Sequence, residues 1–391
     1  MTTNNLASSQ DQFKLLTHAD DRNIARVSSM HEGGAESQIV VSVVVPTRNE
    51  ARYIHACLQS LVNQTFPCER YEILVADGRS SDNSRDIVAL FETTNVRVRL
   101  LDNAAQTTPS GMNLGIRSAI GEVIVIAGAH TLYPVDFVEN CFRWLDKTGA
   151  DVVGGPVTTI VSGENFGAKL AGMVLSSPFG VGNSHFRISS EEAYVDTVPF
   201  GAYRRTILER VGLFNERLIR NQDNDLSARI RNAGGKIFLT PALMTTYIPA
   251  HSFSDLLRQT FQKSQWHIFT LRENMRALGW RHFCPAIFVT ITSSLSIAAA
   301  LESSIARLLL ALLLLAYFSL GFFASFGRPS KHSRFLTIAM PFACFAFHWA
   351  YGLGTLAGFR NVFVRAPLVP FSHVTGQVQG RYDDYSARKA D

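Results

Sequence analysis

Short apolar runs alternate with helix-forming segments between residues 39 and 127 of this chain. The first run, 39–45, is β-branched apart from Ser42 and ends at Pro46, which is typical of a strand buried on both faces of a parallel sheet. This alternation predicts an α/β fold with a Rossmann-like, mostly parallel sheet. No GxGxxG motif follows the first run, so the pattern does not indicate dinucleotide binding. The predicted strands are 39–45, 73–76, 96–101 and 123–127, and the predicted helices are 51–62, 84–91 and 110–119.

Charged residues become scarce after residue 285. Three uncharged segments, 286–301, 308–326 and 335–359, have 16, 19 and 25 residues. At about 1.5 Å per residue, the second covers roughly 28 Å, close to the ~30 Å of a hydrocarbon core. The second and third segments are predicted to span a membrane, and the first to span it, to re-enter, or to lie at its surface. The glycine cluster at 352–358 is expected to serve helix packing.

Four regions are expected from these changes in composition. A polar leader, 1–38, is predicted to be disordered because it has no apolar core. An α/β domain, 39–281, precedes a membrane region of two to three hydrophobic helices, 282–360, and a polar tail, 361–391. No Lys/Arg-rich run with interleaved aromatics occurs, so nucleic acid is not an expected partner. The five cysteines show no metal-binding spacing.

Two carboxylates directly follow the second predicted strand. Asp77 and Asp82 lie on a Gly/Ser turn in the run Asp77-Gly-Arg-Ser-Ser-Asp82-Asn. Ligands of open α/β sheets bind at the carboxyl ends of strands, where such groups can accept hydrogen bonds from a base or a ribose. The alternative is a purely structural Asx-turn and helix N-cap before Ser84.

Several further motifs follow in a fixed order, and the whole set resembles glycosyltransferase family 2. The resemblance covers about residues 39–270 and implies the GT-A fold and an inverting, nucleotide-sugar-dependent transferase. Asp77-Gly-Arg-Ser, Ala129-His130-Thr131, Gln222-Asp223 and the hydrophobic C-terminal region are most similar to the membrane-associated glucosyltransferases of succinoglycan biosynthesis. The other motifs are Val43-Val-Val-Pro46-Thr47-Arg-Asn49-Glu50, Asn113-Leu-Gly115, Gly121-Glu122, Phe200-Gly-Ala-Tyr-Arg204-Arg205, Asn221-Gln-Asp223-Asn-Asp225-Leu and Arg229-x-Arg231-Asn-Ala-Gly-Gly-Lys.

The resemblance implies roles for the donor-side residues. Asp77 would accept the uracil N3–H, and Asp82 would brace that loop or contact the ribose. Arg204 and Arg205 would face the diphosphate, with two surface arginines as the alternative. The uridine pocket would be completed by Pro46, Thr47, Asn49 and Glu50.

Asp223 matches the general base of the family. An acceptor hydroxyl is a poor nucleophile until a base takes its proton. The alternative is that Asp223 is only a first-turn acid, stabilised by the helix dipole. Asp225 would support Asp223 or be another first-turn acid.

The metal site of the family is altered in this chain. Mg²⁺ or Mn²⁺ normally offsets charge on the leaving diphosphate and is held by acidic residues after the fourth strand. Here Gly128 stands at the first acidic position and His130 at the second. His130 could contact phosphate, bind a metal, or serve the structure.

A second departure lies in Gln262-Lys-Ser-Gln265-Trp266. This run resembles the QxxRW signature of membrane polysaccharide synthases, with Gln265 in place of arginine. The resemblance places Gln262 and Trp266 at the acceptor sugar. An amphipathic helix at 253–271 that lies on the membrane surface is the other interpretation, and both can hold together.

The expected function is transfer of a hexose, glucose from UDP-glucose in the first instance, onto a lipid-linked saccharide in succinoglycan-like exopolysaccharide biosynthesis. The implied partners are the UDP-sugar donor, the lipid-linked saccharide acceptor, membrane lipid and other polysaccharide assembly proteins. Because Gly128 and Gln265 change two functional positions, a catalytically silent scaffold or regulator is the alternative. A nucleotidyltransferase is disfavoured, since the chain has no Gly-rich phosphate loop with a lysine.

The expected location is the cytoplasmic membrane, with several passes and the catalytic domain facing the cytoplasm. The basic loop at 328–334 favours a cytoplasmic position. Three spans would place this loop in the cytoplasm but would leave the arginine-containing tail outside. Two spans with a re-entrant first segment would reverse both positions, so the sequence leaves the topology open.

Overall fold

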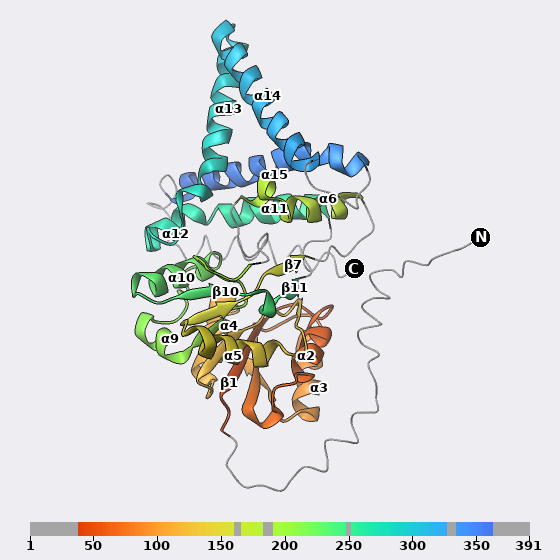
Figure 1. Ribbon diagram of the computed structural model, residues 1–391, viewed down its shortest axis with the longest axis vertical. Coiled ribbons are helices and arrows are strands. Elements are labelled where there is room, and N and C mark those ends of the chain that lie inside the picture. The colour runs from red at the N-terminus through yellow and green to blue at the C-terminus, as the bar shows by residue number, and fades with distance from the viewer. Residues whose placement is uncertain (1–37, 160–165, 183–190, 248–251, 327–333, 363–391) are drawn as a thin grey trace, which may run out of the picture.

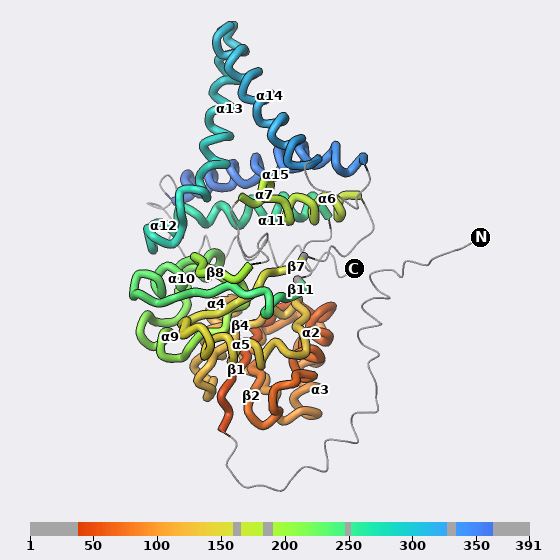
Figure 2. The backbone as a smooth tube through the Cα atoms, in the orientation of Figure 1, coloured from red at the N-terminus to blue at the C-terminus, as the bar shows by residue number. Residues whose placement is uncertain are grey.

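The computed structural model describes residues 38–159, 166–182, 191–247, 252–326 and 334–362. The predicted leader and tail therefore lie almost wholly outside the described residues. A sheet-based domain forms one end of the molecule, and long apolar helices form the other (Figures 1 and 2).

The main sheet has eight strands in the order β3-β2-β1-β4-β9-β6-β10-β8. Strands β1 to β4 pair in parallel, and so do β6 and β10, whereas β9 and β8 are antiparallel to their neighbours. The prediction of a mostly parallel α/β sheet is therefore confirmed. The strands are β1 Val41–Thr47, β2 Tyr71–Asp77, β3 Val98–Asp102, β4 Val123–Ile126, β6 Val152–Gly154, β8 Ala193–Tyr194, β9 Ala202–Arg204 and β10 Ile237–Leu239.

Helices cover both faces of this sheet, because its central strands are apolar on both sides. All seven residues of β2 are buried, including the four of the predicted apolar run 73–76. One face packs against α2 Ile54–Val62, α3 Ser84–Thr94 and α5 Phe137–Thr148. The other face packs against α4 Thr108–Ser118, α9 Arg205–Val211 and α10 Gln222–Asn232.

A small second sheet and several short elements complete this part of the chain. The sheet has the order β5-β11-β7. Its strands are β5 Thr131–Leu132, β7 Val157–Thr159 and β11 Thr245–Tyr247, and the short helices are η2 Cys68–Arg70, α6 Phe166–Leu175, α7 Pro178–Val181 and η3 Pro241–Leu243.

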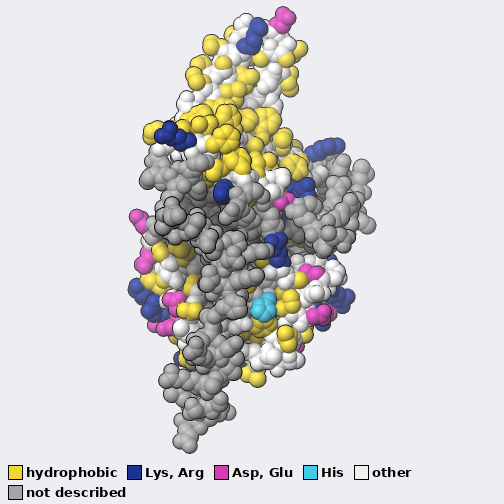
Figure 3. Space-filling model, turned by 90° about the vertical axis from the view of Figure 1, so that its right-hand side faces the viewer, with side chains coloured by type: hydrophobic (Ala, Val, Ile, Leu, Met, Phe, Trp, Pro, Cys, Tyr) yellow, Lys and Arg dark blue, Asp and Glu magenta, His cyan; other side chains and the backbone are white. Residues whose placement is uncertain are grey.

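The apolar helices do not all run in the same direction. Helices α13 (Cys284–Ala300) and α14 (Ser304–Phe326) form a hairpin that stands away from the domain, whereas α15 (Arg334–Arg360) lies across its base (Figure 1). Apolar side chains gather over these helices, and charged side chains over the domain (Figure 3). By length and composition, α14 and α15 could each cross a membrane. The hairpin follows α11 Phe253–Ser264, α12 His267–Glu273 and η4 Trp280–His282.

Helix α15 packs closely on α11 through its glycines. A Cβ atom on Gly354 would lie 2.0 Å from Ser264 Oγ, and one on Gly358 would lie 2.3 Å from the Gln265 carbonyl oxygen. The predicted packing role of the 352–358 glycines is confirmed. Unlike a helix surrounded by lipid, α15 is thus held along one side by protein.

Helix α4 makes a comparably close contact with β1, and this contact can be tested. A Cβ atom on Gly115 would lie 2.2 Å from Val44 Cγ1. We expect Gly115→Val to lower the free energy of unfolding by about 1–3 kcal/mol, because overpacking displaces helix from strand. Thermal unfolding of the purified protein measures this loss. Arg117→Ala on the same helix, whose side chain is 62% exposed, should change stability by less than about 0.5 kcal/mol.

Candidate active site at the carboxyl ends of the strands

The loops after β1 and β2 interlock at the carboxyl edge of the sheet. The Asn49 amide N–H donates to Ser80 Oγ at 2.9 Å, and Asn49 Oδ1 accepts from the Ser81 amide at 2.8 Å. Asn49 has a positive φ of 54°, which asparagine tolerates better than most residues. Pro46 and Thr47 end β1 beside this loop. The sequence-predicted donor residues from these two loops are therefore brought together.

Asp82 braces the two loops. Its Oδ2 accepts from the Ala51 amide at 3.1 Å, and its Oδ1 accepts from the Ser84 amide at 3.0 Å. One carboxylate thus holds the turn before α2 and the start of α3. The ribose contact implied by the family resemblance stays a prediction.

Asp77 is fully buried, and both of its oxygens already accept hydrogen bonds. Ser80 Oγ donates to Oδ1 at 2.6 Å, while the Ser80 amide and Arg85 Nη1 donate to Oδ2 at 3.2 and 3.3 Å. Arg85 also reaches Asp102 at 3.2 Å. One acceptor site remains on Oδ1 by lone-pair count, but the side chain is fully buried, so a uracil N3–H can reach it only where a covering group moves aside. Neither Ser80 nor Arg85 is among the sequence-predicted site residues, although Ser80 belongs to the run Asp77-Gly-Arg-Ser.

An aromatic ring fills the place of the first acidic metal ligand. A Cβ atom on Gly128 would lie 2.6 Å from Phe200 Cε1. The Gly128 amide donates to Tyr133 Oη at 2.7 Å, and Cys57 Sγ donates to the Gly128 carbonyl at 3.4 Å. Burial raises the pKa of the Cys57 thiol, so this donor keeps its proton. Gly128 is therefore required by packing, and an aspartate cannot replace it unless Phe200 moves.

His130 and Glu50 face each other at this edge. His130 Nδ1 lies 3.0 Å from Glu50 Oε1, and both side chains are partly exposed. Mg²⁺ and Mn²⁺ prefer several oxygen ligands, whereas this pair offers one carboxylate and one imidazole. In the part of the chain that the structure describes, no three His, Cys, Asp or Glu residues come together as metal ligands. The residues present do not fit the divalent metal that the resemblance implies.

Asp223 lies in the first turn of α10 and remains available to a substrate. Nothing among the described residues hydrogen-bonds or ion-pairs with its half-buried carboxylate. By contrast, Asp225 accepts from Arg229 Nε at 3.0 Å and from Asn274 Nδ2 at 2.8 Å. Burial and the nearby Asp223 charge raise the pKa of Tyr203. Asp225 therefore has a structural role, whereas the described residues leave the carboxylate oxygens of Asp223 without a hydrogen bond or ion pair.

The interpretation of Arg204 and Arg205 as diphosphate ligands is wrong. Arg204 pairs in register with Val123, the first residue of β4, and so lies at the opposite edge of the sheet from Asp77. Its Nε donates to the Ala150 carbonyl at 3.0 Å, and Arg205 Nε donates to the Gly121 carbonyl at 2.9 Å. Both guanidinium groups satisfy buried carbonyls where chain segments meet. The antiparallel register between β9 and β4 places Arg204 at this edge of the sheet, and the motif alone does not predict that register.

Trp266 is not placed to support an acceptor sugar. Its side chain is 4% exposed and packs with Leu218, Phe269 and Val362. This part of the acceptor-site interpretation is also wrong, because no ring face is open to a ligand. Gln262 lies half-buried on α11, and its acceptor role stays a prediction.

The contact between Gly128 and Phe200 can be tested by a double-mutant cycle. We expect Gly128→Ala to lower the free energy of unfolding by about 1–3 kcal/mol, because the added methyl group meets the Phe200 ring. In a Phe200→Ala background the same change should cost little, giving a coupling of at least about 1 kcal/mol. Thermal or urea unfolding of the four proteins measures it. Additive effects would contradict this packing.

Comparison with known proteins agrees with the geometry. Residues 42–212 match the family described as "Glycosyl transferase family 2". Over 326 residues, the chain is 26% identical to the "Dolichyl N-acetyl-alpha-D-glucosaminyl phosphate 3-beta-D-2,3-diacetamido-2,3-dideoxy-beta-D-glucuronosyltransferase" of Methanococcus voltae, covering 81% of this chain and 96% of that protein. It is also 26% identical to the Succinoglycan biosynthesis protein ExoA of Rhizobium meliloti, over 62% of this chain and 73% of that protein.

A solved structure shows the same fold. It is the mannosyltransferase PcManGT from Pyrobaculum calidifontis in complex with GDP-Man and Mn²⁺. The TM-score is 0.53 at 18% sequence identity, and the match covers 90% of this chain and 96% of that one. At this identity the likeness speaks for the fold alone.

Proposed function

Because residues 42–212 belong to glycosyltransferase family 2, we propose that this chain transfers a hexose from a UDP-sugar, with UDP-glucose as the first candidate, onto a lipid-linked saccharide at a membrane surface. The proposal rests on which carboxylates of the site already have hydrogen-bond partners within the protein. Asp77, Asp82 and Asp225 hold parts of the protein together, whereas no described residue hydrogen-bonds or ion-pairs with the half-buried Asp223. A general base must keep its lone pairs for the substrate.

The reaction follows from this assignment. Asp223 takes the proton of an acceptor hydroxyl, and the freed oxygen attacks the anomeric carbon of the donor sugar. The bond from that carbon to the diphosphate breaks on the opposite side, so the configuration inverts and UDP leaves. The loops after β1 and β2 bind the uridine, with Asp82 fixing their shape.

The names of the relatives support a lipid-linked acceptor. The Methanococcus voltae protein is named for an acceptor carried on dolichyl phosphate, and the Rhizobium meliloti protein for succinoglycan biosynthesis. In this chain α12 and η4 connect the domain to the apolar hairpin. An acceptor anchored in lipid is thereby kept close to Asp223, which raises its effective concentration. Other polysaccharide assembly proteins would act before and after this step.

We propose that the chain lies in the cytoplasmic membrane, with α13 and α14 crossing it as a hairpin. Helix α15, which its length and composition predict to span, would instead lie in the membrane plane, because it runs across the base of the hairpin (Figure 1). At about 1.5 Å per residue, the 17 residues of α13 and 23 of α14 reach roughly 25 and 35 Å. A hairpin returns the chain to the side of the catalytic domain. The basic loop at 328–334 and the arginine-containing tail then share the cytoplasmic side, which satisfies the positive-inside tendency.

A catalytically silent scaffold is the second candidate. Phe200 occupies the place of the first metal-binding carboxylate, and this observation favours it. UDP binding by calorimetry, followed by assays of donor turnover, separates the two functions. Binding with no hydrolysis and no transfer to any acceptor would favour the scaffold.

The role of Asp223 can be tested directly. We expect Asp223→Asn to lower kcat for sugar transfer by about 10²–10⁴-fold, because the amide cannot take the hydroxyl proton. The Kd for UDP should change less than about twofold, since uridine binds at the other loops. Glu209→Gln, at an exposed position on α9, is the matched control and should keep full activity. Undiminished transfer by Asp223→Asn would exclude this residue as the base.

The hairpin topology can be tested with cysteine labelling in intact cells. We expect Glu302→Cys, between α13 and α14, to react with a membrane-impermeant maleimide added outside. Arg334→Cys, at the start of α15, should react only after the cells are opened. The exposed native Cys68 is the internal control for the cytoplasmic side. Labelling of Arg334→Cys from outside would show instead that α14 does not return the chain to the cytoplasm.

A further inference from the structure

The ring of Phe200 fills the place of the first acidic metal ligand, and its neighbours hold it there. Its Cε1 and Cζ atoms would lie 2.6 and 3.1 Å from a Cβ atom on Gly128. Tyr133 meets this ring edge-on, with 6.5 Å between the ring centroids, and its hydroxyl oxygen accepts from the Gly128 amide at 2.7 Å. Tyr133 is buried and packs in turn on Phe137. The site therefore has no room for a carboxylate at position 128.

The backbone of Phe200 has an unusual conformation. Its φ of 48° lies in the left-handed region, which bulky residues rarely adopt. The residues that follow are fixed on β9, because the Gly201 carbonyl accepts from the Ile126 amide at 3.0 Å and Ala202 pairs with Val125 of β4. The register between β4 and β9 thus brings the ring to the position directly after β4. Strain that is retained at a ligand-binding edge of a sheet indicates a role in function.

The second acidic position does not compensate for the first. His130 stands there, with its Nδ1 3.0 Å from Glu50 Oε1. The backbone of Glu50 is fixed, since its amide donates to Ser84 Oγ at 2.7 Å. Mg²⁺ and Mn²⁺ are bound mainly through oxygen atoms, whereas an imidazole favours softer ions. This pair therefore offers a divalent ion a single carboxylate, and one oxygen of that carboxylate already faces the imidazole.

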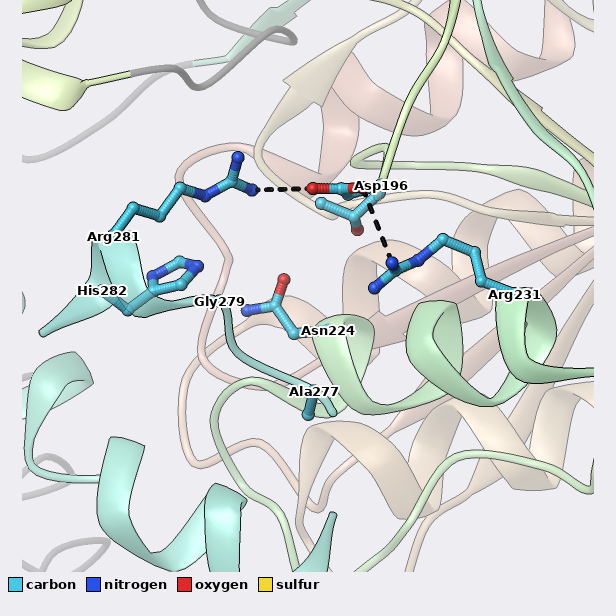
Figure 4. A pocket seen from close by; sticks show the side chains of 8 residues that line it. Asp196, Asn224, Arg231, Ala277, Gly279, Arg281 and His282 are labelled. Carbon is cyan, nitrogen blue, oxygen red and sulfur yellow. Dashed lines mark ion pairs between the residues drawn. The ribbon is translucent and has the colours of Figure 1, made fainter. Parts of the chain in front are cut away.

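The other carboxylates around the site do not supply the missing ligand. At the end of β3, Asp102 pairs with Arg85 at 3.2 Å. Beside α10, Asp196 lies between Arg231 and Arg281, at 3.6 and 3.4 Å, and these side chains point toward one another (Figure 4). In the described part of the chain, no group of acidic side chains completes a metal position. Three further carboxylates are held by the hydrogen bonds described above, namely Asp77, Asp82 and Asp225.

The charge on a leaving diphosphate can be stabilised in two ways. A divalent ion can bind the phosphate oxygens and offset their charge. Hydrogen-bond donors that the protein holds in place can also stabilise such charge, without any ion. In this chain the first ligand position is closed by an aromatic ring, and the second offers one carboxylate beside an imidazole. The geometry therefore disfavours the first way and leaves the second.

We propose that this chain binds its UDP-sugar without a divalent metal ion, and that the contact between Gly128 and Phe200 determines this property. The inference rests on the proposed function, in which a UDP-sugar is the donor. The transfer balances without the ion. The acceptor oxygen bonds to the anomeric carbon as the bond from that carbon to the diphosphate breaks. The electron pair of the broken bond stays on UDP, and the proton of the acceptor hydroxyl passes to Asp223.

Calorimetry of the native full-length protein tests the metal requirement. The protein, held in lipid nanodiscs and treated with EDTA, is titrated with UDP in EDTA and again with excess Mn²⁺. We expect the two Kd values to agree within about threefold, because the protein does not join the ion to the nucleotide. Glucose transfer from UDP-glucose to phytanyl-phosphate-linked N-acetylglucosamine should likewise proceed in EDTA. A larger gain in UDP affinity with Mn²⁺, or transfer that requires Mn²⁺, overturns the inference.

Two double variants test the role of the contact itself. Gly128→Asp with Phe200→Ala supplies a carboxylate at the first position and removes the ring that excludes it. We expect the Kd of this variant for UDP to be at least about tenfold lower with Mn²⁺ than in EDTA, since a further oxygen ligand then joins Glu50 and His130. Gly128→Asn with Phe200→Ala has the same size without the charge and should respond as the native protein does. A gain in both variants, or in neither, overturns the role of the contact.

Further measurements keep the two proposals separate. Thermal unfolding shows whether each double variant is folded, and Phe200→Gly, which accepts a positive φ, replaces Phe200→Ala where it is not. A native protein that binds UDP equally with and without Mn²⁺, but neither hydrolyses UDP-glucose nor transfers its sugar, would overturn the proposed function alone. No binding of UDP under either condition would overturn both proposals.

Discussion

Two hydrogen bonds join the helix that carries Asp223 to the helix that leads toward the membrane. Asn221 Nδ2 donates to Thr270 Oγ1 at 3.2 Å, and Asn274 Nδ2 donates to Asp225 Oδ1 at 2.8 Å. Asn221 holds a positive φ of 63° at the start of α10, which aims the first turn of this helix. Because these contacts set the position of Asp223 against α12, the site depends on them as much as on the sheet.

The aspartates of this site differ in role because they differ in partners. Asp82 and Asp225 each accept at least two hydrogen bonds from the protein, and Asp77 is wholly buried with three donors. Each of these three carboxylates holds loops or helices together through its hydrogen bonds. Asp223 has no such donor among the described residues. Residue type therefore marks the candidates, and hydrogen-bond occupancy separates structural carboxylates from one that can accept a substrate proton.

Local patterns were enough to predict the sheet, the apolar helices and the closeness of the loops after β1 and β2. Runs such as 39–45 predict buried strands because burial on both faces demands apolar residues throughout. Local patterns do not predict how distant strands and helices pair and pack. Arg204 lies at the wrong edge because β9 runs antiparallel to β4, and Trp266 is buried because α12 folds onto Leu218. His282 and Tyr351 are far apart in the sequence, and only the packing of α15 brings them together.

Under the proposed function, the two substrates would be bound by different parts of the chain. Loops of the parallel sheet would bind the nucleotide, whereas a lipid-linked acceptor would approach from the side of α12 and η4, which lead into the hairpin. Helix α10 is connected to this second part, since it supplies Asp223 and is joined to α12 by the hydrogen bond from Asn274 to Asp225. Changes in α12 or η4 would then be expected to alter use of the acceptor and to leave the loops after β1 and β2 unchanged. The helices proposed to hold the protein at the membrane would thus also determine how the acceptor reaches Asp223.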